Sequence, residues 1–276
     1  MRSMVRRNIT LYFRDKANVF FSMLSIMIII ALYALFLGQG YWGSDGIRDS
    51  WLMSGVLAVA TLTTALGAFV VMVEDKANKI AKGFYASPVK RSHIATAYMI
   101  SPFVVSVIMT ILTALGFGAY IALTDGYMPD TGALLQIMGL ILLSSITATA
   151  IACFMVSFMK TISVYGTVST IVGTLAGFLM GIYMPIGILP RAVQTVMMLF
   201  PPSHAAMLFR QILMEQPLET ISATGYDVTN LKETLGVIFY FGEFEVTPAV
   251  SITFLVATTI FFFGLSIINI RKAKVG

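Results

Sequence analysis

The sequence has 276 residues, of which 58% are hydrophobic and only 11% are charged, with a formal net charge of +5. Soluble domains carry about 25% charged residues, so this chain has too few to cover a water-soluble fold of its length. The charged residues also cluster, which leaves long stretches that contain none. The composition therefore excludes a soluble globular protein and indicates an all-α integral membrane protein, since helices satisfy their own backbone groups in lipid.

Six windows lack Asp, Glu, Lys and Arg and are long enough to cross a bilayer, which takes about 20 apolar residues. In chain order they are residues 17–38, 51–73, 94–123, 131–159, 161–184 and 248–270. We expect each window to form a transmembrane helix. Aromatic residues near the window ends fit the aromatic belts of membrane interfaces: Tyr41, Trp42, Trp51, Tyr120, Tyr127 and Tyr183.

The first window follows several basic residues, as the core of a signal peptide does. It is longer than the roughly 7–15 residues of such a core, and no clear small-residue cleavage site follows it, so we expect a retained helix. Cys153, the single cysteine, lies inside a window and cannot form an internal disulfide. Its simplest role is that of a small packing residue.

Six spans place both termini, residues 74–93 and the loop near residue 160 on the same side of the membrane. That side carries 14 basic and three acidic residues, a net charge of +11, whereas the other side carries four basic and ten acidic residues, a net charge of −6. Basic residues in short loops stay cytoplasmic, so we expect cytoplasmic termini. The basic character then reflects topology and attraction to inner-leaflet lipids. We expect no nucleic-acid partner.

The sequence lacks residues that several classes of membrane protein need for their function. The uncharged windows disfavour a proton-driven carrier, although sodium coupling through backbone carbonyls stays open. The sequence has no HExxH motif, Cys/His cluster or P-loop GxxxxGK[ST]. His93 and His204 lie on opposite sides of the predicted topology, so we interpret both as structural. We expect no catalytic, metal or cofactor site in this chain.

The stretch EDKANKIAKGFYASPVKR, residues 74–91, carries many charges between two apolar windows. Four apolar residues fall on one face of a helix: Ala77, Ile80, Ala81 and Phe84. Glu74 and Asp75 would occupy its first turn, where acids suit the helix dipole. Gly83 and Pro88 favour its end. This pattern predicts a short amphipathic helix that either lies on anionic lipid or docks a cytoplasmic partner.

Residues 1–16 show a similar pattern. Val5, Ile9, Tyr12 and Phe13 share one helical face, and basic residues lie on the other, although Leu11 falls off the apolar face. This pattern predicts a cytoplasmic amphipathic helix. It either orients the protein or acts as a lever that joins a partner to the first span.

Prolines are concentrated after the fifth window: Pro185, Pro190, Pro201 and Pro202. Because proline interrupts helices, we expect a helix end near the first of these, a short helix at 190–200, a turn at the proline pair and a helix at 203–214. Both helices are too short to span a membrane. We expect residues 185–214 to form an external re-entrant hairpin, or else an ordinary external loop. Residues 215–247 would form a further external loop, in which LGVIFYFGEFEV either packs on the bundle or forms a hairpin.

Three stretches, in this order and spacing, resemble those of a bacterial ABC-2-type transporter permease over nearly the whole chain. RRNITLYFRDKANVFF resembles the connecting helix before the first span. VMVEDKANKIAKGFYASPVKRSHIATAY resembles the coupling segment, with Glu74, Phe84, Pro88 and Arg91 in the matching places. MPIGILPRAVQTVMMLFPPSHAAMLFRQIL resembles the half-membrane external hairpin before the last span. Gly83 is a departure, since close relatives would carry an acidic or polar residue there.

The resemblance implies a single transmembrane domain over residues 1–276, in the bacterial plasma membrane. Two permeases, identical or related, would pair and bind two copies of an ABC ATPase subunit, which holds ATP and Mg²⁺. ATP binding would close the ATPases, and the coupling segments would transmit that motion to the spans, generally for export. The uncharged spans favour an amphipathic or hydrophobic substrate, such as a drug, an antimicrobial peptide or a lipid. The alternatives are a non-transporting sensor or immunity subunit and an ion-coupled secondary carrier.

The resemblance also implies roles for particular residues. The ATPase-coupling residues would be Glu74, Asp75, Lys76, Ile80, Phe84, Tyr85, Pro88 and Arg91. The connecting helix would use Arg6, Arg7, Tyr12, Phe13 and Arg14, and the external hairpin would contain Pro185, Pro190, Pro201, Pro202 and His204. Met23, Met27, Phe69 and Phe178 are candidates for lining a substrate route, although core packing is the simpler role for each.

Overall fold

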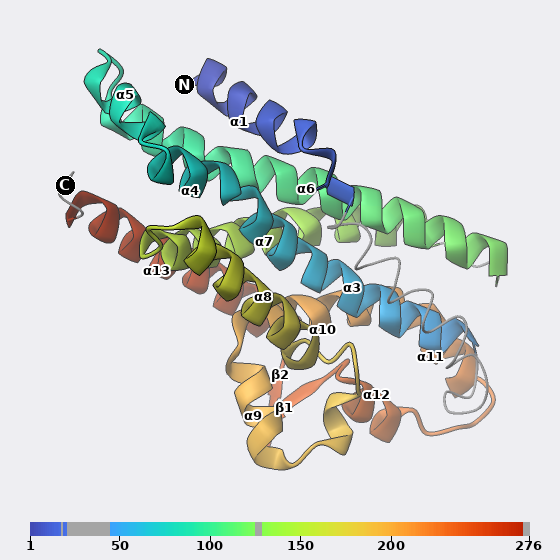
Figure 1. Ribbon diagram of the computed structural model, residues 1–276. Coiled ribbons are helices and arrows are strands. Elements are labelled where there is room, and N and C mark those ends of the chain that lie inside the picture. The colour runs from blue at the N-terminus through green and yellow to red at the C-terminus, as the bar shows by residue number, and fades with distance from the viewer. Residues whose placement is uncertain (18, 21–44, 125–128, 273–276) are drawn as a thin grey trace.

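The computed structural model describes residues 1–17, 19–20, 45–124 and 129–272 (Figure 1). In chain order the elements are α1 (Arg2–Arg14), α3 (Asp45–Ala68), α4 (Val70–Ala77), α5 (Ile80–Ala86), α6 (Arg91–Thr124), α7 (Thr131–Ser157), α8 (Ile162–Leu179), the 3-10 helix η1 (Ile186–Ile188), α9 (Arg191–Leu199), α10 (Pro201–Leu213), α11 (Glu215–Ser222), α12 (Thr229–Leu235), β1 (Phe239–Phe241), β2 (Phe244–Val246) and α13 (Pro248–Lys272). Helices dominate, as the composition predicts.

Five segments of the described residues are long and apolar enough to cross a membrane. They are Gly46–Ala77, Ser92–Ala122, Thr131–Ser157, Ile162–Leu179 and Pro248–Asn269. These segments correspond to the last five of the six predicted windows. The first window, 17–38, falls almost entirely outside the described residues, as do Met23, Met27, Tyr41, Trp42 and Tyr127. The six-span topology therefore stays a prediction.

Two span boundaries differ from the prediction. The helix of the second window begins at Asp45, so the buried residues Arg48 and Asp49 lie within it. Their side chains pair with each other, with Arg48 Nε 2.7 Å from Asp49 Oδ1. A pair of opposite charges allows burial that an unpaired charge would not, and a search for uncharged windows misses it.

The fifth span ends at Leu179, well before the proline at which we expected it to end. The chain leaves the helix at Gly181, whose φ of +68° suits glycine. The Ile182 N–H donates to the Gly177 carbonyl, and the Gly181 N–H donates to the Phe178 carbonyl, both at 3.0 Å. These two bonds form a Schellman motif, so glycine rather than proline ends this helix.

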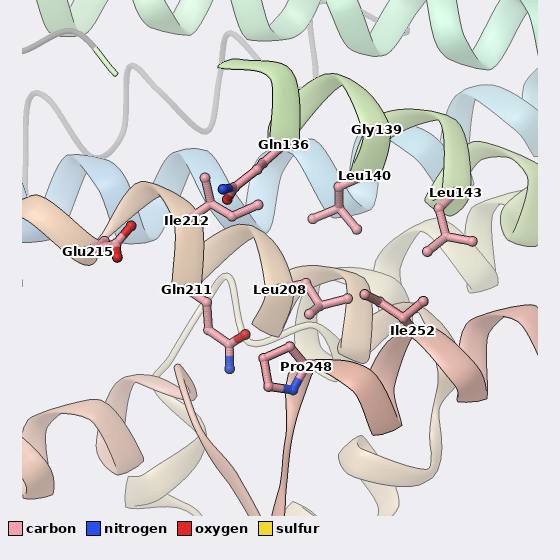
Figure 2. A pocket seen from close by; sticks show the side chains of 10 residues that line it. All are labelled: Gln136, Gly139, Leu140, Leu143, Leu208, Gln211, Ile212, Glu215, Pro248 and Ile252. Atoms are coloured by element: carbon pink, nitrogen blue, oxygen red, sulfur yellow. The ribbon is translucent and has the colours of Figure 1, made fainter. Parts of the chain in front are cut away.

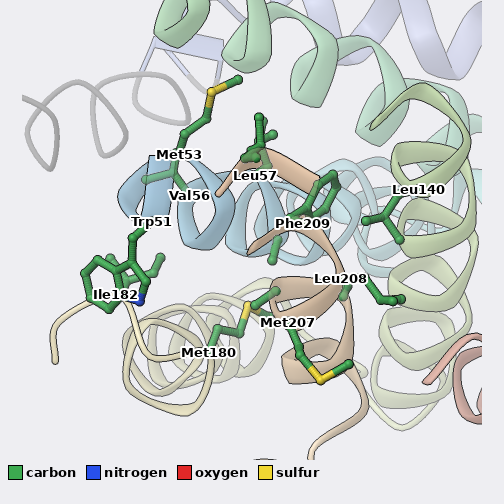
Figure 3. Close-up of a cluster of buried hydrophobic side chains, with 14 of the residues drawn as sticks. Trp51, Met53, Val56, Leu57, Leu140, Met180, Ile182, Met207, Leu208 and Phe209 are labelled. Carbon is green, nitrogen blue, oxygen red and sulfur yellow. The ribbon is translucent and has the colours of Figure 1, made fainter. Parts of the chain in front are cut away.

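The helix α3 is the centre of the bundle and contacts α6, α7, α8 and α10. Its most apolar window is 78% buried, compared with 17% for α8 and 22% for α13, which lie at the periphery. The largest apolar cluster surrounds Trp51 and Leu57 of α3 and Phe209 of α10 (Figure 3). Trp51 is fully buried and donates its Nε1–H to the Leu235 carbonyl at 2.9 Å. The expectation that it belongs to an aromatic belt is therefore wrong.

Hydroxyl groups join the uncharged spans. Thr147 of α7 and Thr259 of α13 lie 2.8 Å apart through their Oγ1 atoms. The Ser106 hydroxyl of α6 donates to the Thr61 carbonyl of α3 at 2.8 Å. Interhelical hydrogen bonds of this kind stabilise packing between membrane helices, where the hydrophobic effect contributes little.

The two ends of the bundle differ in composition. The start of α1, the helix α5, the α7–α8 connection and the end of α13 lie toward one end, and the elements from η1 to β2 lie toward the other (Figure 1). The first group contains the basic segments that the sequence predicts to share a side of the membrane.

Candidate functional site

The segment 74–91 forms two helices instead of the predicted single one. The first, α4, ends at Ala77, and α5 begins at Ile80 after Lys79, which has a left-handed φ of +62°. Glu74 and Asp75 therefore lie near the end of α4 and not in a first turn, because the apolar run before them continues α4 from the bundle. The predicted common apolar face is also divided, since Ala77 and Ile80 are exposed and Ala81 is buried.

The end of α5 agrees only in part with the prediction. Gly83 lies inside the helix and does not end it. The helix ends at Ala86, and Ser87 is extended with ψ at 160°, which is the conformation that a following proline favours. Pro88 therefore ends the helix in the predicted way, and it is exposed.

A buried carboxylate joins α4 to the N-terminal helix. Arg7 of α1 forms two hydrogen bonds with Asp75, each 2.8 Å long, from its Nη1 and Nη2 atoms to the two carboxylate oxygens. The Tyr98 hydroxyl of α6 donates to Asp75 Oδ2 at 2.5 Å. We call these residues the Arg7–Asp75–Tyr98 cluster. It connects three helices, of which α1 lies far from the other two in the sequence.

The burial of this cluster makes its pairing necessary. The Asp75 side chain is 3% exposed, while that of Arg7 is 31% exposed. The hydrogen bond to Asp75 raises the pKa of Arg7 above its ordinary value, against the opposing effect of burial. Removing one member of a buried pair leaves an uncompensated charge, at a cost of about 3–5 kcal/mol in fully buried cases. The contact between α1 and α4 is therefore strongly favoured as long as both charges are present.

Apolar contacts reinforce the same junction. The Arg7 guanidinium carbon lies 5.1 Å from the centroid of the Phe84 ring, within cation–π range. Phe84 of α5 and Met4 of α1 both pack on a buried cluster that includes Phe69 and Tyr98. A cavity of about 230 Å³ opens beside them. Its lining residues are Met1, Ser3, Met4, Arg7, Phe84, Ser87, Val89, His93 and Ile94.

The rest of α1 lies lengthwise along α6 (Figure 1). Tyr12 is 2% exposed and packs with Val105 and Met109 of α6, and the partly buried Ile9 and Phe13 lie against the same cluster. Leu11 is exposed, in agreement with its position off the predicted apolar face. The amphipathic pattern thus gives the packed face of α1 only in part. Arg7, which it places on the opposite face, pairs with the buried Asp75, and Asn8 is also buried.

The remaining predicted coupling and connecting residues divide by exposure. Glu74, Arg6 and Arg14 are exposed, and Lys76 is half-buried. Ile80 is 44% exposed although it is apolar. The side chains of Tyr85 and Arg91 lie outside the described part of the structure. Of the candidate route residues, Phe69 is fully buried in the core, whereas Phe178 is 48% exposed on α8.

The proline-rich segment contains the two expected short helices, α9 and α10. The chain turns at Phe200, and Pro201 and Pro202 occupy the first turn of α10, so the predicted turn at the proline pair is wrong. Proline suits this position because the first helical N–H groups have no partner within the helix. Pro190 directly precedes α9, and Pro185 precedes η1.

His204 of α10 is buried between two hydrogen-bond partners. Its Nε2 lies 2.8 Å from the Met198 carbonyl oxygen and its Nδ1 lies 2.9 Å from the Ser251 hydroxyl. A carbonyl oxygen only accepts, so Nε2 carries the proton and Nδ1 accepts from the hydroxyl. Burial lowers the pKa of His204, which favours this neutral form. The geometry agrees with the expected structural role.

Arg210 is 2% exposed in α10, and its structural role was not predicted from the sequence. Its Nη2 donates to the Met180 carbonyl at 2.7 Å and to the Gly181 carbonyl at 3.0 Å. Its guanidinium carbon lies 5.4 Å from the centroid of the Trp51 ring. The available signal was that Arg210 is the one charged residue between residues 192 and 214.

The stretch LGVIFYFGEFEV forms a hairpin and also packs on the bundle. The strands β1 and β2 pair antiparallel, with Phe239 opposite Val246. Both of these side chains are at least 98% buried. The two alternatives left open by the sequence therefore occur together.

Comparison with known families identifies the chain. A family model described as ABC-2 family transporter protein matches residues 14–268, which is most of the sequence. The chain belongs to the ABC-2 transporter family. It is a multi-pass membrane permease, a non-catalytic transport subunit whose family works with a separate ATPase. Comparison with curated proteins finds no match.

Proposed function

We propose that this ABC-2 permease belongs to an ATP-driven exporter and that α1, α4 and α5 form the surface that receives the ATPase subunit. The Arg7–Asp75–Tyr98 cluster is the observation that carries this proposal, because it joins the predicted connecting helix to the predicted coupling segment. A force applied to α5 would then act on α1 and on α6 together. In the proposed topology this end of the bundle and both termini are cytoplasmic.

The exposed part of this surface suits a protein partner. Ile80 and Val89 are each 44% exposed beside basic side chains such as Lys82. Apolar groups surrounded by charged ones are typical of interfaces. The coupling role of Glu74, Asp75, Lys76, Ile80, Phe84, Tyr85, Pro88 and Arg91 is proposed on this basis.

A break in the helix offers a route from this surface to the centre of the bundle. The helix α4 follows α3 after a single residue, Phe69, at which the regular hydrogen bonding is interrupted. The Tyr165 hydroxyl of α8 lies 2.7 Å from the Leu66 carbonyl and 3.0 Å from the Gly67 carbonyl. Movement of α4 would therefore change the angle at this break and act on both α3 and α8.

We propose a second permease copy as a partner through α8. This helix is the least buried of the five candidate spans and presents Ile171 and Leu175, each about half exposed. The pair could be identical or consist of two related permeases, with membrane lipids around it. An uncharged pathway between the two copies would suit a hydrophobic or amphipathic substrate, moved outward, with ATP and Mg²⁺ held by the ATPase. The helices α9 and α10 are proposed to form the re-entrant hairpin on the external side.

The docking surface can be tested with two exposed isoleucines at opposite ends of the molecule. Ile80 lies in α5, and Ile188 lies in η1 with 64% exposure. We expect Ile80→Asp to abolish copurification of a stoichiometric P-loop ATPase in mild detergent, and Ile188→Asp to preserve it. Equal copurification with both variants would place the docking surface elsewhere.

The transport role needs its own test. We expect Phe84→Asp to leave ATP hydrolysis by the bound ATPase but uncouple it from export. Deletion of residues 76–84, which also removes Ile80, should in addition release the ATPase. Normal export by a stably folded deletion variant would reject this coupling role. Export that persists in cells without the ATPase would favour the ion-coupled carrier, and a complex that hydrolyses ATP without moving any substrate would favour the sensor or immunity subunit.

A further inference from the structure

A cavity of about 540 Å³ lies between α7, α10 and α13, on a part of the molecule that the proposed transport mechanism does not use. Figure 2 shows its polar side chains, Gln136, Gln211 and Glu215, toward one end, and Leu143 and Ile252 toward the other. Sites for small molecules typically measure about 300–1,000 Å³ and combine apolar walls with a few polar groups. This cavity has both properties.

The polarity of the cavity changes with depth along a candidate span. The helix α7 begins at Thr131, and Gln136 lies closer to this start than Leu143 does. At 1.5 Å per residue, Leu143 lies about 10 Å farther along the helix. The polar end is therefore nearer the membrane surface, and the apolar end is deeper. This gradient matches an amphiphile in one leaflet, whose head lies at the surface and whose chain points inward.

The polar end favours a cation. The Gln211 Nε2 donates to the Val237 carbonyl at 2.9 Å, which leaves the amide oxygen as an acceptor for a ligand. Glu215 supplies an exposed carboxylate, and none of the described residues that line the cavity is basic. A head group that donates hydrogen bonds or carries positive charge therefore complements this end better than an anionic one.

We propose that this cavity binds a single-chain amphiphile with a cationic head group, taken from the leaflet opposite the coupling segment. In the proposed topology this is the outer leaflet. The alkyl chain lies against Leu143, Leu208 and Ile252, and the head group lies beside Glu215 and the amide of Gln211. The inference does not rest on transport, because it concerns equilibrium binding to this chain alone. Its failure would leave the ATPase-docking proposal intact.

Two substitutions change the cavity without demanding a rearrangement. A Cβ added at Gly139 would meet no atom within 4 Å, so we expect Gly139→Leu to place its side chain in the cavity without disturbing the helix. Its matched control is Gly264→Leu in α13, where a Cβ also meets nothing within 4 Å and which does not line the cavity. Glu215→Gln removes the carboxylate charge, and Glu219→Gln removes another exposed charge of the same helix as its control.

The experiment uses the purified chain in nanodiscs of zwitterionic lipid and a dodecyltrimethylammonium probe with a photoreactive diazirine on its chain. Labelled peptides are identified by mass spectrometry, and unlabelled dodecyltrimethylammonium or dodecyl sulfate is added as a competitor. We expect labelling of α7, α10 or α13, and competition that is about tenfold stronger for the cation than for the anion. Thermal stability without probe checks that each variant is folded.

The variants should distinguish binding of the probe in the cavity from its non-specific partitioning into lipid. Gly139→Leu should weaken labelling by about tenfold or more, because the chain loses its apolar site. Glu215→Gln should weaken it by about threefold, as expected for an exposed charge pair. The two control variants should label as the wild type does. Equal labelling of Gly139→Leu and Gly264→Leu, or equal competition by the anion, would overturn the proposal.

Discussion

One buried or partly buried arginine stabilises each end of this permease, and the two arginines make different kinds of contact. Arg7 is partly exposed and pairs with the side chains of Asp75 and Phe84. Arg210 is fully buried and donates to the backbone carbonyls of Met180 and Gly181. The guanidinium group of Arg7 therefore joins side chains on separate helices, whereas that of Arg210 fixes the position of the main chain.

The difference indicates where the molecule can move. Contacts between side chains of separate helices can shift or re-form while each helix stays intact. Contacts to backbone carbonyls at a helix end cannot shift without unfolding that end, since the freed carbonyls would be buried and unpaired. We therefore expect motion at the end that contains α1, α4 and α5 and rigidity at the end that contains α10 and α12.

The largest effect is expected at the rigid end. Arg210→Ala removes hydrogen bonds to two carbonyls and a large buried side chain, so it should lower the free energy of unfolding by about 3 kcal/mol or more. The control is Arg191→Ala, because Arg191 is 74% exposed and lies 3.4 Å from Glu233. This control should cost less than about 1 kcal/mol. Unfolding in mixed micelles measures both, and similar losses would refute the fixing role of Arg210.

A smaller loss is expected at the coupling end. Arg7→Ala and Asp75→Asn should each destabilise the protein by about 2 kcal/mol, less than a fully buried pair because Arg7 reaches solvent. In a double-mutant cycle the two substitutions should show a coupling energy of about 1–2 kcal/mol. Arg6→Ala, which removes an exposed neighbouring charge, is the matched control. Additive effects of Arg7→Ala and Asp75→Asn would show that the ion pair does not join α1 to α4.

The helix break offers a more local test. Tyr165→Phe removes the hydroxyl that lies beside the carbonyls of Leu66 and Gly67, and it should cost about 1 kcal/mol of stability. If motion passes through this break, the variant should also lower the export obtained per ATP hydrolysed. Tyr183→Phe on an exposed tyrosine is the control. A loss of stability with unchanged coupling would restrict Tyr165 to a structural role.

The smallest expected effect is a pH dependence of the free energy of unfolding that is due to His204. The pKa of His204 is lowered by burial, whereas in the unfolded chain it is about 6.5. Between these two values the unfolded state binds more protons, so the free energy of unfolding should fall as the pH drops below about 6.5, then level off below the native pKa. His204→Gln should remove this fall, and His93→Gln, on an exposed histidine, should preserve it. A fall that persists in His204→Gln would assign it to another group.

The sequence predicted the features that follow from hydrophobicity over long stretches. Such patterns predicted the windows that match α6, α7 and α13, the two short helices after the fifth window and the apolar part of the packed face of α1. They did not predict that Arg7 and Asn8 would also face the bundle. The break between α4 and α5 was not predicted, because Lys79 adopts there a left-handed conformation that lysine does not favour. Hydrophobic periodicity does not report the backbone conformation of a single residue.

The candidate site was predicted only in part for a similar reason. Asp75 was expected to be a helix-start acid, but tertiary contacts bury it against Arg7 and Tyr98. Buried pairs such as Arg48 and Asp49 give no hydrophobic signal, so a search for uncharged windows cannot find them. Arg210 was the clearest clue that could have been used, as a lone charge in an otherwise uncharged stretch.

Hydrogen exchange of the permease–ATPase complex, with and without a non-hydrolysable ATP analogue, tests the central claim most directly, since exchange reports local opening of backbone hydrogen bonds. We predict nucleotide-dependent changes in Arg2–Arg14, Val70–Ala77 and Ile80–Ala86, and none in Pro201–Leu213. Arg7→Ala should remove the change in α1 and leave the change in α5. A change confined to Pro201–Leu213, or a response of α1 that persists without Arg7, would contradict the claim that ATP-driven motion passes through the Arg7–Asp75–Tyr98 cluster.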